Sequence, residues 1–154
     1  MNNSAFSTPV PVSEISNRIH ALKTRMENTG TSAVFLTHKP DIYYFSGTAQ
    51  DAYLYVPVDH DPLLFVRRYL PRAVAETGID QVIPVASITR IPEQIHSVHG
   101  RLPTSLGLAF DVVPVRDFQF FETLFTPAVM TDATSMITDC RMIKSGWEID
   151  RMAV

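Results

Sequence analysis

Two apolar runs separated by only three residues constrain the fold of this chain more than any other feature. The runs "AYLYVPV" (52–58) and "PLLFV" (62–66) are both strand-like. Only Asp59, His60 and Asp61 lie between them. So short a connection allows the two strands to pair only in the antiparallel direction, because a parallel pair needs a crossover of a dozen or more residues. The sequence therefore predicts a β-hairpin here.

The segments before the hairpin predict two helices around one buried strand. The first helix has Ser13 as its cap and ends at Gly30, because glycine suits the left-handed conformation at a helix end. The run "SAVFLT" (32–37) indicates a buried strand, and "KPDIYYFSG" (39–47) a short helix with proline in its first turn. The first helix carries an apolar stripe at helical spacing, formed by Ile15, Ile19, Leu22 and Met26.

After the hairpin, strands alternate with helices. The expected helices cover about 69–77, 91–98 and 115–125, and the expected strands cover 81–85, 105–110 and 128–130. Such alternation favours parallel pairing, so together with the hairpin it predicts an α/β fold with a mixed five- to six-stranded sheet flanked by helices. One face of the expected helix over about 115–125 is apolar, and it is formed by Phe118, Phe121, Leu124 and Phe125.

The composition limits the class of protein. With 154 residues, 45% hydrophobic and 19% charged, the chain has the size and composition of one globular domain. A net charge of −3 argues against a nucleic-acid surface, and the longest apolar runs are too short to span a bilayer. Cys140 is the only cysteine, which fits a reducing cytosol, and we interpret it as a structural thiol on a helix face. We therefore expect a cytoplasmic protein with no nucleic-acid and no membrane partner.

Two histidine-containing motifs suggest metal sites but have simpler explanations. His96 and His99 could share a helix face and hold zinc, yet no third and fourth ligand is evident. The segment 59–61 could form a cation loop, although Asp and His are ordinary turn residues between two strands. We favour a solvated helix face and a turn, and we expect no metal site in this chain.

Three aspartates are the best carboxylate candidates for chemistry. Asp41, Asp51 and Asp111 could together hold magnesium in a nuclease-like domain, and Asp111 closes a predicted strand. A helix cap or a turn explains each of them singly. No glycine-rich phosphate loop and no nucleophile elbow is present in the sequence. We therefore expect no catalytic residue in this chain.

The last ten residues, "SGWEIDRMAV", contain the start of a helix. Ser145 and Glu148 have the spacing of a capping box, in which each side chain accepts a hydrogen bond from the backbone of the other residue. Ile149, Met152 and Ala153 follow at helical spacing. We expect this helix to have nothing to pack against and to be marginal in water, since isolated helices shorter than about twelve residues rarely persist.

Four segments resemble the N-terminal domain of the creatinase, prolidase and aminopeptidase P family. "SAVFLTHKPDIYYFSG" resembles that family's first strand and its aromatic–x–x–Gly turn, and "DAYLYVPVDHDPLLFVRRY" resembles its hairpin with an Arg-Tyr step. "LGLAFD" and the helix after it resemble a later strand–helix unit. "CRMIKSGWEIDRMAV" is the most specific segment, because it resembles the passage in which the N-terminal domain ends and the first catalytic-domain helix begins.

The resemblance implies a ribonuclease H-like fold and a particular division of the chain. Residues 1–12 would be a flexible arm, 13–141 the creatinase/prolidase-like domain, and 142–154 a linker and the start of the first helix of an absent catalytic domain. The family's catalytic residues, around two divalent ions of the Mn or Co type, would lie in that absent domain. We therefore expect a chain cut at a domain boundary, with no cofactor of its own.

The resemblance also implies a role at the mouth of an active site. The N-terminal domain would restrict substrate length, contribute to a homodimer of the full-length protein and contact peptide substrate beside its own C-terminal catalytic domain. The loop after Gly47 is the segment that would reach a neighbouring active site. The gating or interface candidates on and around it are Tyr44, Gln50, Asp51 and Tyr53, with Arg67 and Arg68 near the end of the hairpin.

The leading hypothesis is thus a non-catalytic N-terminal domain of a Xaa-Pro metallopeptidase or a creatinase-like hydrolase. A free-standing binding or dimerisation module is the alternative. Nine Phe, five Tyr and one Trp suggest it, because one small core needs fewer aromatic side chains.

Overall fold

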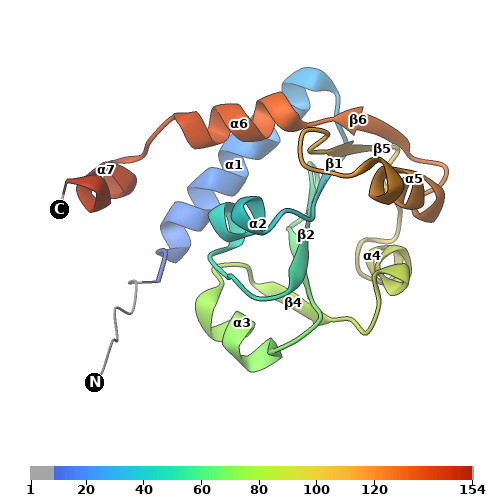
Figure 1. Ribbon diagram of the computed structural model, residues 1–154, viewed down its shortest axis with the longest axis horizontal. Helices are drawn as coiled ribbons and strands as arrows, with labels where there is room; N and C mark the ends of the chain where they lie inside the picture. The colour runs from blue at the N-terminus through green and yellow to red at the C-terminus, as the bar shows by residue number, and fades with distance from the viewer. Residues whose placement is uncertain (1–8, 154) are drawn as a thin grey trace.

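Six strands form one mixed sheet in the computed structural model, which describes residues 9–153 (Figure 1). The strand order is β4-β3-β2-β1-β5-β6; β2 is antiparallel to β1 and β3, while the pairs β1–β5, β3–β4 and β5–β6 are parallel. The predicted hairpin and mixed α/β sheet are therefore confirmed. The strands are β1 (Ala33–Leu36), β2 (Ala52–Pro57), β3 (Leu63–Val66), β4 (Gln81–Pro84), β5 (Ser105–Leu108) and β6 (Val129–Asp132).

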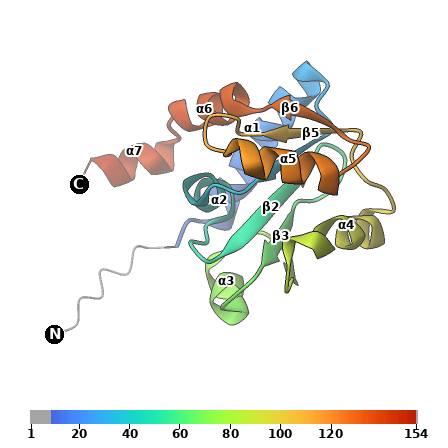
Figure 2. The same ribbon diagram turned by 45° about the vertical axis from the view of Figure 1, so that its right-hand side comes forward.

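Helices cover both faces of this sheet (Figure 2). One core lies between the sheet and α1, α2, α3 and α6, and a second core lies between the sheet and α4 and α5. None of the helices in residues 9–153 is long and apolar enough to cross a membrane. The helices are α1 (Val12–Thr29), α2 (Lys39–Ser46), α3 (Leu70–Glu76), α4 (Ile91–His99), α5 (Val115–Leu124), α6 (Thr134–Met142) and α7 (Gly146–Met152), with a 3-10 turn at Ile88–Arg90.

The central strands are apolar throughout because both of their faces are buried. In β1, Val34 and Leu36 point into the first core, whereas Ala33 and Phe35 point into the second. The second core is rich in aromatic rings: Phe35 lies 5.6 Å from Phe121 and 5.1 Å from Phe125, measured between ring centroids. The aromatic side chains predicted on the helix after β5 therefore do pack on the sheet.

The first helix differs from the prediction at its start. Its predicted stripe is buried and Gly30 ends it in the left-handed conformation with φ 71°. The prediction that Ser13 caps the helix is wrong, because Pro11 holds the cap position and α1 begins at Val12 without a side-chain cap. The fixed φ of proline turns the chain into the helix before Ser13 is reached. Residues 1–8 of the expected arm lie outside the described residues, and Val10 is buried in the first core.

Gly47 ends α2 as predicted, in a conformation that other residues rarely adopt. Its φ is 85°, and a Cβ at this position would lie 3.1 Å from the carbonyl oxygen of Glu76. The chain can therefore pass close to the end of α3 as it enters the loop before β2.

The C-terminal part of the chain differs from the prediction in two ways: the bounds of α6 were not predicted, and α7 has packing partners. The sequence predicted no bounds for α6, although it placed Cys140 on a helix face, where the thiol is in fact buried. The capping box of Ser145 and Glu148 is confirmed at the start of α7. The expectation that this helix has nothing to pack against is wrong, because Trp147 packs against the first core and Arg18 of α1 binds Glu148.

Candidate functional site

The loop after Gly47 and the end of the hairpin meet at one edge of the molecule. The Asp51 backbone carbonyl accepts a hydrogen bond from the Arg67 N–H at 2.9 Å, and the Arg67 guanidinium lies 3.8 Å from the Asp51 carboxylate. The Gln50 amide nitrogen donates to both carboxylate oxygens of Glu76, at 3.2 and 3.3 Å. The structure thus brings together three of the predicted residues, and we call Gln50, Asp51, Arg67 and Glu76 the rim cluster.

Glu76 is the residue of the rim cluster that sequence reasoning missed. Its carboxylate also accepts a hydrogen bond from the Thr48 hydroxyl at 2.8 Å. Burial alone would raise the pKa of Glu76, but hydrogen bonds from Thr48, Gln50 and the Ala49 backbone, with Arg72 nearby, hold the pKa below its ordinary value. The sequence did contain a signal for Glu76, because it lies in the last turn of an expected helix. A carboxylate there interacts unfavourably with the helix dipole and so needs another partner.

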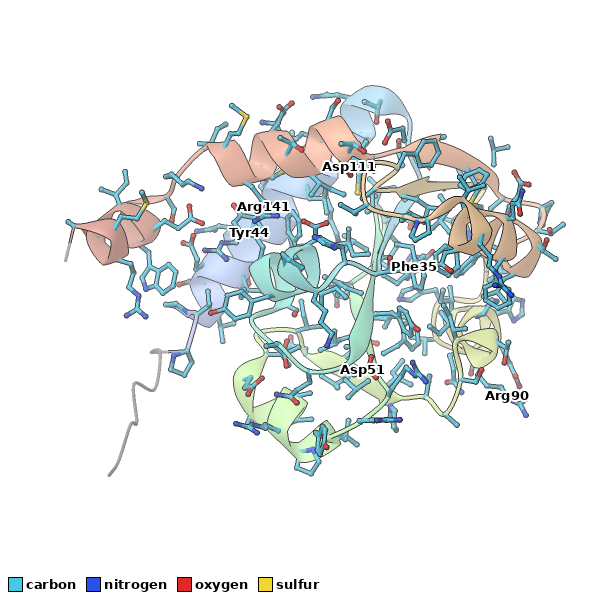
Figure 3. The ribbon with its side chains drawn as sticks, in the orientation of Figure 1. Phe35, Tyr44, Asp51, Arg90, Asp111 and Arg141 are labelled. Carbon is cyan, nitrogen blue, oxygen red and sulfur yellow. The ribbon has the colours of Figure 1, made fainter. Side chains whose placement is uncertain are left out.

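Of the other predicted residues, Tyr53 and Tyr44 lie apart from the rim cluster. Tyr53 points to the opposite face of the sheet, where its ring stacks on Phe35 with 5.7 Å between centroids. Tyr44 lies among α1, α2 and α6, and its hydroxyl donates to the Cys140 carbonyl at 2.8 Å (Figure 3). Burial, with Glu148 nearby, raises the pKa of Tyr44 to about 12. Arg68 is exposed next to the rim cluster.

A crevice opens at the carboxyl ends of β1 and β5. After β1 the chain turns to α2 on one face of the sheet, and after β5 it reaches α5 on the other face. Ligands of open α/β sheets bind at such a switch point. Two clefts of about 650 and 590 Å³ meet there and share His38 and Val112. Tyr53 lines the larger cleft, while Asp41, Asp111 and Arg141 line the smaller one.

The three candidate aspartates do not form a metal site. Asp41 is buried and accepts a hydrogen bond from Arg141 at 2.9 Å; burial raises its pKa, and His38 and Arg141 partly offset this. Asp111 accepts from the Thr134 hydroxyl at 3.2 Å, and Asp51, directly before β2, lies away from Asp111 (Figure 3). Within residues 9–153, no group of three or more His, Cys, Asp or Glu side chains could hold a metal ion. The nuclease-like hypothesis therefore lacks its site.

The two histidine motifs meet in the structure, but not as ligands. His96 is exposed, whereas the His99 ring stacks on His60 of the hairpin turn at 4.5 Å and 24°. Nearly parallel rings direct their nitrogen lone pairs in parallel planes, so they do not converge on one ion. Burial, followed by the proximity of His60 and Lys23, lowers the pKa of His99, and Asp61 opposes this. His60 and His99 thus join the hairpin turn to the end of α4.

Comparison with known proteins identifies the family and the fold. The model of the creatinase/prolidase N-terminal domain matches residues 18–143. No curated protein matches the sequence at a significant level. An Xaa-Pro aminopeptidase (aminopeptidase P) from Streptococcus thermophilus is similar in structure, with TM-score 0.71 and 16% identity over 83% of this chain and 98% of that chain. The N-terminal domain of the cytoplasmic peptidase PepQ from Mycobacterium tuberculosis has TM-score 0.70 and 18% identity, over 81% and 98%.

Some of the similar structures are longer than this chain. An Xaa-Pro dipeptidase from Bacillus anthracis matches 88% of this chain with TM-score 0.76 and 15% identity, but the match covers 38% of that dipeptidase. The chain thus spans less than half the length of this dipeptidase.

Proposed function

The chain belongs to the creatinase/prolidase N-terminal domain family, and from this we propose that it is the non-catalytic N-terminal domain of a dimetal hydrolase. The parent would be an Xaa-Pro peptidase of the aminopeptidase P or prolidase kind, or a creatinase-like hydrolase. The family match over residues 18–143 carries this proposal, together with the similarity to Xaa-Pro peptidases of known structure. We place the protein in the cytoplasm, which its single cysteine, buried in the fold, and the similarity to a cytoplasmic peptidase support.

The metal ions belong to the proposed catalytic domain. Two ions of the Mn or Co type would there polarise the scissile carbonyl and activate water. The described residues of this chain do not fit such a pair, because they offer no cluster of acidic or histidine ligands. We assign this domain instead a role in shaping the approach to that site and in dimerisation.

The rim cluster is the part of the domain that we assign to substrate access. Asp51 and Arg67 are both more than a third exposed, so they can contact a peptide or a second subunit. Glu76 holds the loop behind them through Thr48 and Gln50, so the exposed side chains start from a fixed backbone. A charged pair on a supported loop is suited to limiting the length of a peptide that enters a neighbouring active site.

The catalytic domain would follow α7. Ile149 and Met152 on this helix are 55% and 71% exposed, and we expect the following domain to cover them. Sequencing the gene beyond the codon for Val154 tests this directly. An open frame of about two hundred codons, enough for a further domain, with spaced Asp, Asp, His, Glu and Glu would support the proposal. A stop codon would favour the free-standing module instead.

Activity of the isolated chain gives a second test. Purified 1–154 with manganese or cobalt should not cleave Xaa-Pro dipeptides or tripeptides, because residues 9–153 contain no group of ligands for a metal pair. The same assay with the full-length parent is the positive control. Turnover by the isolated chain that chelators abolish and added metal restores would contradict the proposal.

A free-standing dimerisation module is the second candidate. The aromatic content that suggested it is largely accounted for, because Phe35, Phe45, Phe65 and Phe125 are fully buried in the two cores. The exposed apolar side chains near the C-terminus still favour an interface: Met142, Ile143, Ile149 and Met152. Sedimentation of 1–154 at micromolar concentration separates the two cases, since a strict monomer would count against this module.

A further inference from the structure

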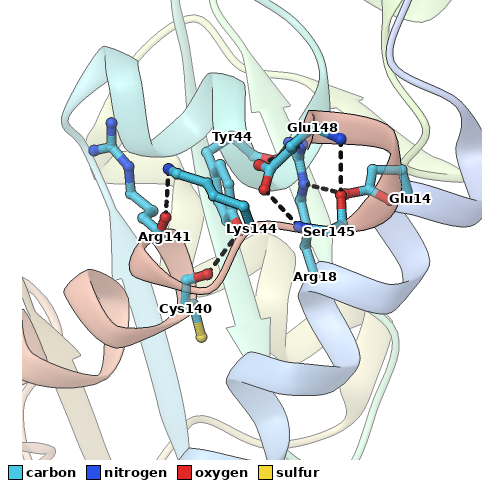
Figure 4. A network of polar contacts seen from close by, with 8 residues as sticks. All are labelled: Glu14, Arg18, Tyr44, Cys140, Arg141, Lys144, Ser145 and Glu148. Atoms are coloured by element: carbon cyan, nitrogen blue, oxygen red, sulfur yellow. Dashed lines mark hydrogen bonds and ion pairs between the residues drawn. The ribbon is translucent and has the colours of Figure 1, made fainter. Parts of the chain in front are cut away.

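Arg18 is a buried arginine that joins three helices. Its Nε donates to Glu14 one turn earlier in α1 at 3.2 Å, and its Nη1 donates to the Tyr44 carbonyl in the last turn of α2 at 2.7 Å. Its Nη2 donates to Glu148 in α7 at 2.9 Å (Figure 4). A guanidinium is planar with its donors in fixed directions, so three acceptors bound at once also fix the positions of the three helices.

Ser145 connects the capping box of α7 to the same cluster. Its hydroxyl donates to Glu14 at 2.6 Å and accepts from the Glu148 N–H at 3.1 Å. The Glu148 carboxylate in turn accepts from the Ser145 N–H at 3.0 Å while it also binds Arg18. The groups that begin α7 are therefore the groups that hold it to α1 (Figure 4).

Aromatic rings complete the surroundings of Arg18. The guanidinium lies 4.1 Å from the centroid of the Tyr44 ring and 5.7 Å from that of Trp147. Trp147 packs against the first core, whereas Ile149 and Met152 on the outer side of α7 are exposed. The inner side of α7 is thus ordered by contacts with the domain, whereas Ile149 and Met152 remain more than half exposed.

The length of α7 makes this anchoring necessary. A helix of seven residues does not persist alone in water, so its order depends on the contacts around Arg18. Arg25, two turns further along α1, provides a contrast, because its pair with Asp139 is longer, at 3.4 Å, and its two side chains are 32% and 52% exposed. Exposed pairs contribute little, whereas loss of Arg18 would leave two buried carboxylates without their cation.

We propose that Arg18 is a positioning residue that locks α7 to the domain, so that the two move as one body. A segment that follows α7 then leaves the domain in one fixed direction. This last consequence rests on the proposed function, in which a catalytic domain follows α7. The lock itself does not, and the experiment measures only the lock.

Amide hydrogen exchange of the 154-residue chain carrying Arg18→Met tests the lock. The Ile149 and Ala153 amides, which bond within α7, should exchange at least about 30-fold faster once the short helix loses its anchor. Amides of β1 should keep their protection. Acrylamide should quench the fluorescence of Trp147, the only tryptophan, more strongly, because the ring becomes exposed. Trypsin should cleave faster after Lys144.

Matched variants make the result decisive. Arg25→Met removes a partly exposed arginine that makes no contact with α7 in the described residues, and it should leave exchange in α7 unchanged. Glu148→Gln and Ser145→Ala each remove part of the cluster, should accelerate exchange in α7 by a smaller factor, and decide the question if Arg18→Met does not fold. Unchanged exchange of α7 in a folded Arg18→Met chain would overturn the proposal. So would equal acceleration in α7 and β1, because α7 would then open only with the whole domain.

A missing catalytic domain gives a different result from a missing lock. A stop codon after Val154 would remove the proposed function and the directional consequence, while the exchange results would stand. Unchanged exchange of α7 would remove the lock and leave the family role untouched.

Discussion

The rim cluster and the Arg18 cluster use the same chemistry in opposite surroundings. In the rim cluster, Asp51 and Arg67 lie 3.8 Å apart and both side chains are more than a third exposed. Between α1 and α7, the Arg18 side chain is 7% exposed and binds Glu148 at 2.9 Å. Exposed pairs contribute about 0–1 kcal/mol, whereas breaking a buried pair costs about 3–5 kcal/mol. An exposed arginine–carboxylate pair can therefore adjust to a binding partner, whereas a buried pair holds two helices in fixed positions relative to each other.

The largest expected effect is the loss of the buried cation. Arg18→Met should lower the free energy of unfolding by about 2–3 kcal/mol, somewhat less than for a rigid buried pair, because Glu148 can leave with α7 while Glu14 stays on α1. Urea unfolding measures this loss. Arg25→Met should cost less than about 0.5 kcal/mol. Equal losses for the two variants would break the comparison.

Glu76 should give the next largest effect, because it connects exposed residues to a supported loop. Glu76→Gln should cost about 1 kcal/mol at pH 7, since an amide cannot replace both carboxylate oxygens as acceptors. The folded-state pKa of Glu76 lies below its ordinary 4.5, so its stabilisation is complete above pH 4.5 and is lost as the pH falls through the folded-state pKa.

Urea unfolding at pH 7 and below pH 4 measures this pH dependence. The gap between the wild type and Glu76→Gln should shrink at the lower pH, while the gap for Arg25→Met serves as a reference from an exposed pair. A gap that stays constant would show that the Glu76 charge contributes nothing to the loop.

The elements of the fold could be predicted where a simple pattern of apolar residues marks them in the sequence. The hairpin follows from two apolar runs joined by three residues, and α1 follows from an apolar stripe of period 3.6; both are present. The bounds of α6 could not be predicted, because Ala133 at its start makes no side-chain cap and β6 before it is short and partly exposed. Pro11 makes α1 begin at Val12, before the predicted cap Ser13. The apolar pattern gives no information about this local effect.

The Arg18 cluster shows why sites are harder to predict than elements. Each half is visible in the sequence, as a Glu14–Arg18 pair one turn apart and as the capping box of Ser145 and Glu148. The halves are separated by about 130 positions, and only the packing of α6 beside α1 brings them together. Tyr44, which we predict as a gating or interface candidate, also contacts Arg18 and the Cys140 carbonyl within this joint, and its gating role stays a prediction.

The stacked rings of His60 and His99 at the hairpin turn are intermediate between the rim cluster and the Arg18 cluster. Their effect on the free energy of unfolding should be smaller than that of Glu76. Below pH 6.5 the unfolded chain takes up a proton on His99 more readily than the folded chain, because burial and His60 lower the folded-state pKa. Stability should therefore fall as the pH drops from 6.5 through the folded-state pKa. His99→Phe, which keeps a ring against His60, should flatten the profile between pH 7 and pH 5.5, as measured by urea unfolding.

His96→Phe is the control for this prediction, because His96 is on the same helix but exposed. Its profile should match that of the wild type. A profile that stays steep in His99→Phe would assign the pH dependence to another group.

The smallest effect on stability should come from the exposed pair of the rim cluster. Asp51→Asn should change the free energy of unfolding by less than about 0.5 kcal/mol, because water replaces the Arg67 contact at little cost. The proposed role of the rim cluster predicts a different outcome in the full-length parent. There, Asp51→Ala with Arg67→Ala should raise kcat/KM for longer peptides several-fold relative to dipeptides, since a truncated rim no longer limits length. Arg25→Ala, at a partly exposed arginine outside the rim cluster, should leave that ratio unchanged. A rim variant that alters stability strongly, or leaves the ratio unchanged, would show that this exposed pair is structural after all.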